Sequence, residues 1–184
     1  MSSGEIKITK LDAARRQLRT AIELWFNDGE PVSIHTLACS AHQIIHDLNR
    51  KKKGSPLIFD SPIFKEEYKK EAVRFLKNAS NFFKHADFRK QQVESIDFIP
   101  RSSDMFILFS VRGLQFLRVT LNDVESAFWF WTVIHNPHFL TPEGRKIVID
   151  PFPINDLTEL RAHSKKDFLY YFLRARRETA AAAR

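Results

Sequence analysis

The stretch EEYKKEAVRFLKNASNFFKHAD (residues 66–87) carries the strongest helical pattern in the chain. Its apolar residues recur at the three- and four-residue spacing of one helical face, so we expect a helix over about residues 64–86. That face comprises Tyr68, Ala72, Phe75, Leu76, Ala79, Phe82, Phe83 and Ala86. A polar ladder follows one edge of the face and is formed by Arg74, Asn78, Asn81 and His85. The pattern therefore predicts a helix that packs by its aromatic face and ends in a polar corner at residues 78–87.

The segments on either side of this stretch are also predicted to be helical. Apolar periodicity indicates helices from Thr9 or Lys10 to Phe26 and over about residues 31–50, 103–118 and 122–136, with a final helix from about residue 164. Gly29 and Pro31 separate the first two, because glycine commonly ends a helix and proline commonly begins one. The segment 103–118 is apolar nearly all round, which is typical of a central buried helix, and a buried strand pair turning at Gly113 is the alternative.

The connections between these helices are predicted to be irregular. Residues 54–64 contain two prolines, and residues 93–101 favour a short extended piece that ends at Pro100. Residues 137–155 contain four prolines and are predicted to form a loop with one short strand at 146–149. The whole chain, residues 1–184, is thus predicted to be a single all-α domain. We expect a bundle of five to six helices, a long proline-containing loop before the C-terminal helix, and frayed tails at 1–8 and 176–184.

Composition and charge narrow the class of protein. The chain has 184 residues with only 5 Gly, which argues against a hairpin-rich β fold. A net charge of +7 suits either a polyanionic partner or a lysine-rich solvated surface. The single cysteine, Cys39, rules out an intrachain disulfide and fits a reducing compartment. Since no apolar run approaches the ~20 residues of a membrane span, we expect a cytoplasmic protein with no membrane partner.

Two groups of polar residues have ordinary structural interpretations. Arg15, Arg16 and Arg19 lie off the apolar stripe of the first helix, as in a solvated face, with phosphate contact as the alternative. Three histidines, His35, His42 and His46, share one flank of the helix at 31–50. His42 and His46 have the i, i+4 spacing of a metal-ligand pair, but no carboxylate accompanies them in a zinc-protease pattern. Polar residues at the boundary of the buried face are the more common arrangement.

The polar corner is the one place where the residue types suggest chemistry. The chain has no glycine-rich phosphate loop, paired-cysteine motif, nucleophile elbow or calcium loop, and we predict no cofactor. Asn81 and His85 are four residues apart and project from the same helical face. A histidine there can act as a general acid or base near neutral pH, with Lys84 as a neighbouring cation. The structural alternative is that Asn81 and His85 close hydrogen bonds at the helix end.

The segment Asn81-Phe-Phe-Lys-His85 resembles the signature of HEPN domains, which are small all-α proteins. That signature is an arginine, a polar residue such as asparagine, three residues and a histidine. The resemblance implies RNA cleavage without metal, in which the histidine moves protons and the arginine steadies the phosphate charge. Ser80 stands where the arginine belongs, so Lys84 or Lys77 would have to supply the cation. On this basis the candidate catalytic residues are His85, Asn81 and Lys84.

A second resemblance covers more of the chain. The segments Lys10–Arg15, Pro31–Thr36 and Asn81–Asp87 together are similar to a group of bacterial proteins of unknown activity. This resemblance implies that the second helix belongs beside the polar corner. The candidate substrate-binding residues are accordingly His35, Thr36, Lys77 and Asp87.

Three functions follow as hypotheses. The first is binding of RNA or a nucleotide in a groove between the helices at 31–50 and 64–86, by a ribonuclease or a degenerate relative of one. The second is a non-catalytic interaction protein that forms a homodimer or holds an antitoxin-like partner, through the aromatic helix at 122–136 or the C-terminal helix. The third is a metal site formed by His35, His42 or His85 with Asp87.

Overall fold

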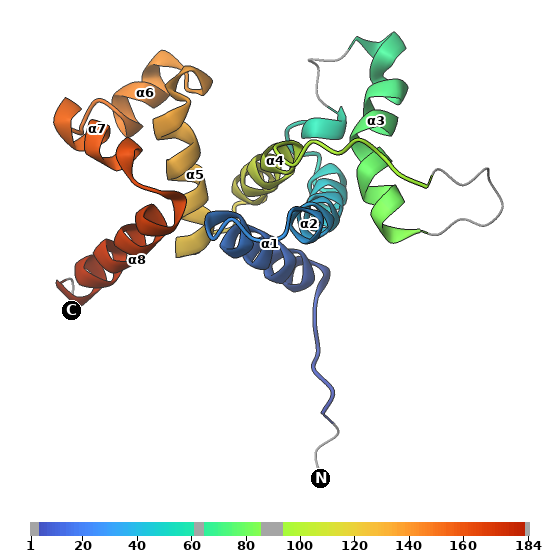
Figure 1. Ribbon diagram of the computed structural model, residues 1–184, viewed down its shortest axis with the longest axis horizontal. Helices are drawn as coiled ribbons and strands as arrows, with labels where there is room; N and C mark the ends of the chain where they lie inside the picture. Colours follow the sequence, from blue (N-terminus) through green and yellow to red (C-terminus); the bar gives the residue numbers. More distant parts are fainter. Residues whose placement is uncertain (1–3, 61–64, 86–93, 183–184) are drawn as a thin grey trace.

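The computed structural model describes residues 4–60, 65–85 and 94–182, and within them the chain is helical without strands. The α-helices are α1 (Lys10–Phe26), α2 (Pro31–Lys51), α3 (Glu66–Lys84), α4 (Ser102–Phe116), α5 (Asp123–His135), α6 (Pro142–Val148), α7 (Ile154–Ala162) and α8 (Lys165–Ala182). Two single-turn 3-10 helices, η1 (Ile58–Asp60) and η2 (Pro137–Phe139), lie between them. The predicted all-α class is confirmed (Figure 1).

Local capping sets where several of these helices begin. Thr9 and Asp12 bond reciprocally at the start of α1, the Thr9 side chain accepting from the Asp12 backbone N–H. Glu30 accepts from two backbone N–H groups of α2, whose first residue is Pro31. Asn122 and Glu125 repeat the reciprocal arrangement at α5. These caps explain why the predicted starts of α1, α2 and α5 fall within about one residue of the observed ones.

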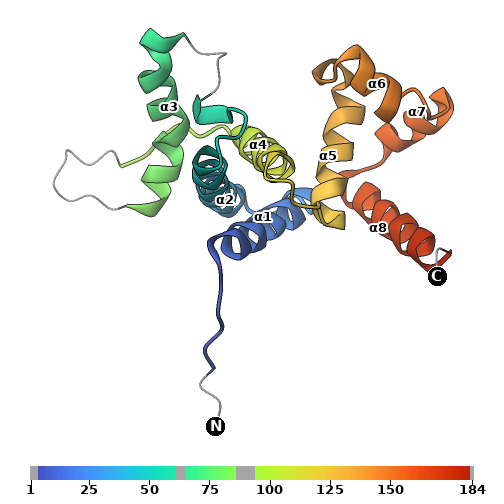
Figure 2. The ribbon, with the colours of Figure 1, turned by 180° about the vertical axis from the view of Figure 1, so that it is seen from behind.

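Helix α2 is the centre of the helical assembly. It packs between α1 and α4, with α3 on its outer side, while α5 lies beside α1 and α4 and is covered by α8 (Figures 1 and 2). The core that joins them runs continuously from α1 to α8, and its largest buried side chains include Leu18, Ile22, Phe26, Ile45, Phe106, Leu114, Phe128 and Phe168. The hydrophobic surface removed from water by this cluster is the main stabilising contribution.

Close contact between α2 and α4 depends on Gly113. A Cβ atom added there would clash with the side chains of Ile45 and Leu57, so only glycine allows the two helices to approach this closely. The alternative of a strand pair turning at Gly113 is therefore wrong, because α4 continues through that residue as a helix.

A buried ion pair ties α1 to α5. The Arg15 guanidinium donates to both carboxylate oxygens of Glu125, at 3.0 and 2.7 Å, and to the Thr120 carbonyl at 3.1 Å. The Glu125 side chain is fully buried, whereas Arg15 is partly exposed. The prediction of a solvated arginine face is therefore wrong for Arg15. Arg19 matches it, since it pairs with Glu23 at the surface.

The proline-rich segment 137–155 departs most from the prediction. Instead of a loop with a strand at 146–149, it forms η2, α6 and the start of α7. The reason is that its prolines occupy helix starts: Thr141 caps α6, Pro142 is the first residue of that helix, and Pro153 precedes α7. The described residues thus contain eight α-helices rather than five or six, and α8 extends to Ala182 through much of the predicted tail.

In the parts of the chain that the structure describes, no helix combines the length and apolar character needed to cross a membrane.

We predict that Arg15→Ala lowers the free energy of unfolding by about 3–5 kcal/mol, because it leaves the Glu125 carboxylate buried without its partner. The matched control is Arg19→Ala in the same helix, which removes only an exposed pair and should cost at most about 1 kcal/mol. Urea denaturation of both variants measures the difference. Equal destabilisation by the two substitutions would contradict a structural role for the Arg15–Glu125 pair.

Candidate functional site

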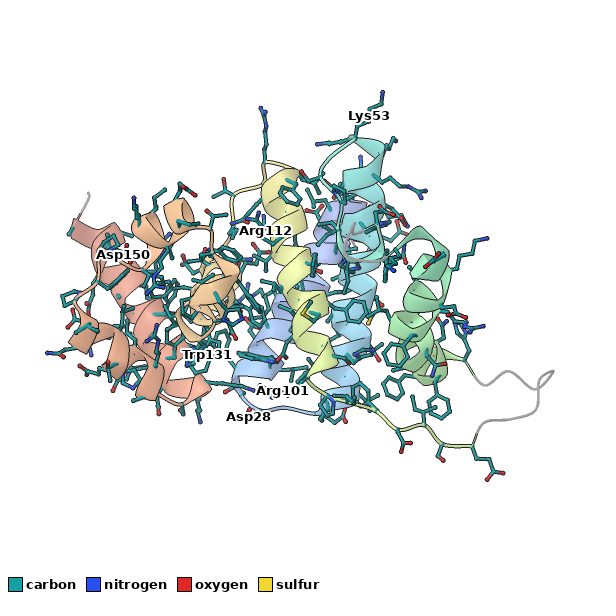
Figure 3. The ribbon with its side chains drawn as sticks, turned by 90° about the horizontal axis from the view of Figure 1, so that it is seen from above. Asp28, Lys53, Arg101, Arg112, Trp131 and Asp150 are labelled. Atoms are coloured by element: carbon teal, nitrogen blue, oxygen red, sulfur yellow. The ribbon has the colours of Figure 1, made fainter. Side chains whose placement is uncertain are left out.

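Helix α3 lies antiparallel to α2, and three pairs of neighbouring residues fix how the two helices are aligned. Phe83 meets the ring of His35 with centroids 5.9 Å apart. One turn earlier on α3, Ser80 hydrogen-bonds the Cys39 thiol. One further turn back along α3, Lys77 lies near His42. Figure 3 shows α3 beside α2, on the side away from α5–α8. The predicted pairing of these two helices is thereby seen in the structure.

A polar stripe on α2 forms the inner wall of this contact, and it consists of His35, Cys39, His42 and His46, at positions i, i+4, i+7 and i+11. All four side chains are buried. Aromatic rings of Phe59, Phe83, Phe98 and Phe106 surround the imidazoles edge to face. The histidines predicted to lie at the boundary of the buried face are therefore inside the molecule.

The stripe is unevenly hydrogen-bonded. His35 Nδ1 lies 3.1 Å from Ser103 Oγ, and its Nε2 lies 3.4 Å from Cys39 Sγ. His46 Nε2 lies 2.7 Å from an Asp60 carboxylate oxygen. Neither ring nitrogen of His42 has a hydrogen-bond partner within the described residues, although the ring is fully buried. A buried polar ring without partners costs free energy, and an ionised one would cost more.

Burial keeps His35 and His42 uncharged near pH 7 and leaves the Cys39 thiol unreactive. Desolvation, with a smaller effect of the Lys84 charge, lowers the pKa of His35 to about 4. Desolvation and the charges of His46 and Lys77 lower the pKa of His42 to about 3. Burial also raises the pKa of Cys39 to about 12, so the thiolate that a nucleophile requires is absent at neutral pH. His35, His42 and Cys39 are thus structural groups near pH 7.

The outward face of α3 has a different character. Arg74, Asn78, Asn81 and His85 are exposed at helical spacing along the C-terminal half of the helix. Lys84 is also exposed, but it lies four residues after Ser80 and so toward the side of α3 that faces α2. Phe75 lies among these exposed residues and is 77 % exposed, although the sequence pattern placed it in the apolar core. The side of α3 that faces α2 instead carries Val73, Leu76, Ser80 and Phe83, so the predicted apolar face was too wide. We call the exposed set Arg74, Phe75, Asn78, Asn81, Lys84 and His85 the α3 outer face.

Some of the predicted site residues are exposed on α3, and others are buried or half-buried. Asn81, Lys84 and His85 share the α3 outer face, whereas His35 is 1 % exposed and lies behind Phe83. Thr36 is half-buried on α2. Lys77 is half-buried, with its Nζ 4.4 Å from the centre of the Phe59 ring. Asp87 lies outside the described residues.

The position of Ser80 bears on the HEPN resemblance. Ser80 is 5 % exposed and turns toward Cys39, whereas His85 caps the end of α3 in an extended conformation and is exposed. An arginine at position 80 would therefore begin its side chain inside the α2–α3 contact. Position 80 therefore supplies no arginine beside His85, and the arginine–histidine pair of the motif is incomplete.

No metal centre is formed by the described residues, where no group of three or more His, Cys, Asp or Glu side chains converges. His42 and His46 have ring centroids 6.0 Å apart, and His46 is already engaged by Asp60. The part of the metal hypothesis that involves Asp87 falls outside these residues.

We predict that acid lowers the stability of the protein through the buried histidines. An unfolded histidine takes up its proton near pH 6.5, whereas His35 and His42 do so only near pH 4 and 3. Between these values the unfolded chain binds more protons, so the free energy of unfolding falls as the pH drops below 6.5, by up to about 1.4 kcal/mol per pH unit for each histidine. Urea titrations at several pH values between 7 and 4.5 measure this slope.

The matched variants for this prediction are His42→Leu and His138→Leu. His42→Leu should reduce the dependence of the unfolding free energy on pH by about 1.4 kcal/mol per pH unit, which corresponds to one proton bound on unfolding. The reason is that the substitution removes a buried ring with no partner in the described structure. His138 is exposed on η2, and its replacement should leave the slope unchanged. A slope that His42→Leu does not reduce would contradict the assignment.

Comparisons with protein-family models, with curated proteins and with solved structures find no match to this chain.

Proposed function

We propose that the protein binds single-stranded RNA through the α3 outer face. The observation that carries this proposal is Phe75, an aromatic ring 77 % exposed on α3. The exposed residues that follow it on the helix are amide-bearing or basic, while the exposed Glu71 lies one turn before it. Exposing such a ring forfeits the stabilisation that burial would give it, about 1.5–3 kcal/mol. A base stacked on the ring recovers part of that free energy, because every base offers a flat π-face.

The charge on this part of α3 favours a polyanion. From residue 74 to residue 85 the chain has Arg74, Lys77 and Lys84 and no carboxylate. The whole chain carries a net charge of +7, which adds a general attraction for phosphate groups. Arg74 and Lys84 are exposed at opposite ends of the segment, so a strand lying along the helix would meet a cation at each end.

The amides supply the remaining recognition chemistry. Asn78 and Asn81 are exposed between the two cations, and each amide offers both donors and an acceptor. Single-stranded RNA presents the unpaired base edges that such groups bond, whereas a duplex hides them. The combination of a stacking ring, two amides and flanking cations therefore suits single-stranded RNA better than a duplex.

Binding is placed ahead of cleavage in this proposal. The HEPN resemblance implies that an arginine supports the histidine, and here Ser80 stands in that place and is buried. In a catalytic form of the site His85 would move the proton of the ribose 2′-hydroxyl, with Lys84 as the cation at the phosphate. Either activity would be exercised in the cytoplasm, where Cys39 stays reduced.

A second candidate function, a protein-interaction surface, is favoured by the outer side of α7 and α8. Ile154, Tyr170 and Tyr171 are 78, 61 and 48 % exposed there. Exposed aromatic and aliphatic side chains of this kind are enriched where proteins meet. The occupant would be a second copy of the chain or an antitoxin-like protein, and light scattering of the purified protein separates a homodimer from a monomer.

We predict that Phe75→Ala weakens binding of a fluorescent oligouridylate by about tenfold, which corresponds to the loss of one stacked base. The matched control is Tyr170→Ala, which removes another exposed ring (61 % exposed) on α8 and should leave the affinity unchanged. Fluorescence anisotropy at low salt measures both variants. Equal affinities for wild type and Phe75→Ala would remove the main support for the proposed surface.

The cations should act through salt-dependent phosphate contacts. Replacing both Arg74 and Lys84 by Gln should weaken binding and reduce the slope of log K against log salt by about 1.4, since each contact with a single strand contributes about 0.7. Lys146→Gln on α6 is the control for removing an exposed cation elsewhere. A slope unchanged by the double substitution would place the phosphate contacts on another surface.

Cleavage is tested separately from binding. We expect labelled tRNA and mRNA incubated in EDTA to remain equally intact with wild type and with His85→Ala, read on a denaturing gel. Cleavage by wild type that His85→Ala abolishes would show a ribonuclease and would require a cation in place of the missing arginine.

A further inference from the structure

A second site lies at the other side of the helical core, where the C-terminal ends of α1 and α5 meet the N-terminal ends of α2, α4 and α8. A cavity of about 780 Å³ opens there, lined by aromatic rings of Trp25, Phe128 and Trp131 and by charged groups of Asp104, Arg101 and Lys165. Asp28, Arg101 and Trp131 mark this end of the helices in Figure 3, away from α3. None of these residues belongs to the α3 outer face.

Asp104 is the group that gives the cavity its chemistry. The indole Nε1–H of Trp25 donates to Asp104 Oδ1 at 2.6 Å, which fixes the carboxylate at the cavity wall. Its second oxygen has no hydrogen-bond partner among the described residues, and Asp104 itself is half-buried. Burial raises the pKa of this carboxyl, because desolvation outweighs the indole hydrogen bond. A desolvated carboxylate with a free oxygen is stabilised by a hydrogen-bonding cation.

The protein's own nearby ammonium group is already occupied. Lys165 Nζ bonds an Asp28 carboxylate oxygen at 2.9 Å and lies 4.0 Å from the centre of the Trp25 ring. Lys165 and Arg101 act on Asp104 only by longer-range electrostatic attraction, without a hydrogen bond to it. The four charged lining residues, two acidic and two basic, sum to zero, so the cavity does not repel a ligand that carries one positive group.

The aromatic walls add to the attraction for a cation. Trp25 packs edge to face against Phe128 at 5.0 Å and against Trp131 at 6.1 Å, next to the Asp104 carboxylate. Ring faces of tryptophan attract ammonium groups, and Lys165 already uses one in this way. A cationic ligand on the carboxylate would therefore lie beside these indoles, of which Trp25 already holds Lys165 on one face and Trp131 stacks on His135 with centroids 4.0 Å apart.

The cavity adjoins a mainly apolar region between α4 and α5, here called the α4–α5 extension. A second hollow of about 530 Å³ shares four lining residues with it, Met105, Leu108, Thr132 and Phe139. Beyond them the lining is mainly apolar, with Phe109, Val133, Leu140 and Val148, and it also includes Arg112. The shared residues place this hollow next to the charged groups, where it offers space for an attached hydrophobic body.

We propose that this cavity binds a small organic amine, with its protonated nitrogen on the Asp104 carboxylate and its apolar or aromatic body directed into the α4–α5 extension. The site is independent of the α3 outer face and adds a small-molecule function to the protein. A zwitterionic amine such as an amino acid belongs to the same class, because Arg101 lines the cavity near Asp104 and can meet a carboxylate.

Three probes of nearly equal shape test the assignment by isothermal titration calorimetry. We expect saturable binding of phenethylamine to the wild-type protein, and no binding of 3-phenylpropionate or 2-phenylethanol, which lack the amine. Phenylalanine in place of phenethylamine shows whether a carboxylate on the ligand adds to or detracts from affinity. Failure of both amines to bind, or equal binding of the neutral alcohol, would overturn the proposal without any mutant.

Asp104→Asn supplies the second arm of the test. Asparagine keeps an oxygen that can accept the Trp25 indole hydrogen bond but removes the charge, so the fold should persist while amine affinity falls at least about tenfold. Asp156→Asn, at an exposed position on α7, is the control. Intrinsic fluorescence, to which Trp25, Trp129 and Trp131 all contribute, gives a second readout of binding. Unchanged affinity in a folded Asp104→Asn protein would contradict the role of this carboxylate.

Discussion

Burial of the polar stripe of α2 is the constraint on which the arrangement of α3 depends. His35, Cys39, His42 and His46 occupy the positions that a core helix normally gives to aliphatic residues, and they are enclosed by phenylalanine rings. Because charged imidazoles could not remain in such surroundings, His35 and His42 are neutral at physiological pH. Ser80 and Phe83 of α3 fit against this stripe and set the register of the helix.

The opposite side of α3 is a consequence of that register. Ser80 is buried, so residues displaced from it around the helix, such as Phe75 and Asn78, must face water. A large apolar ring in that position is costly for a protein that has no use for it. The exposed Phe75 is therefore stronger evidence for a binding surface than the exposed His85. The packing of α3 against α2 therefore determines both which residues are buried at the stripe and which residues form the α3 outer face.

Much of the fold could be predicted from the sequence, since capping residues and apolar spacing are local signals. The starts of α1, α2 and α5 follow from Thr9, Pro31 and Asn122. The helices α6 and α7 were missed because proline was treated as a helix breaker, whereas here it stands at or just before the first helical residue.

The candidate sites were less accessible to sequence reasoning. Which side of α3 faces the core depends on its contacts with α2, and those contacts join residues far apart in the sequence, such as His35 and Phe83, which are 48 positions apart. A helical wheel centred on Ser80 would have placed Phe75 outside, but nothing in the sequence identifies a serine as the buried centre. The cavity at Asp104 was missed for a related reason, since Trp25, Asp104 and Trp131 meet only in the folded chain.

Hydrogen–deuterium exchange with and without a saturating single-stranded RNA tests the central claim, that the α3 outer face is the RNA-binding surface, most directly. The account predicts slower exchange over residues 74–85 on adding RNA, with α5–α8 unchanged. Protection confined to α5–α8, or no protection anywhere in α3 under conditions where the RNA is bound, would contradict it.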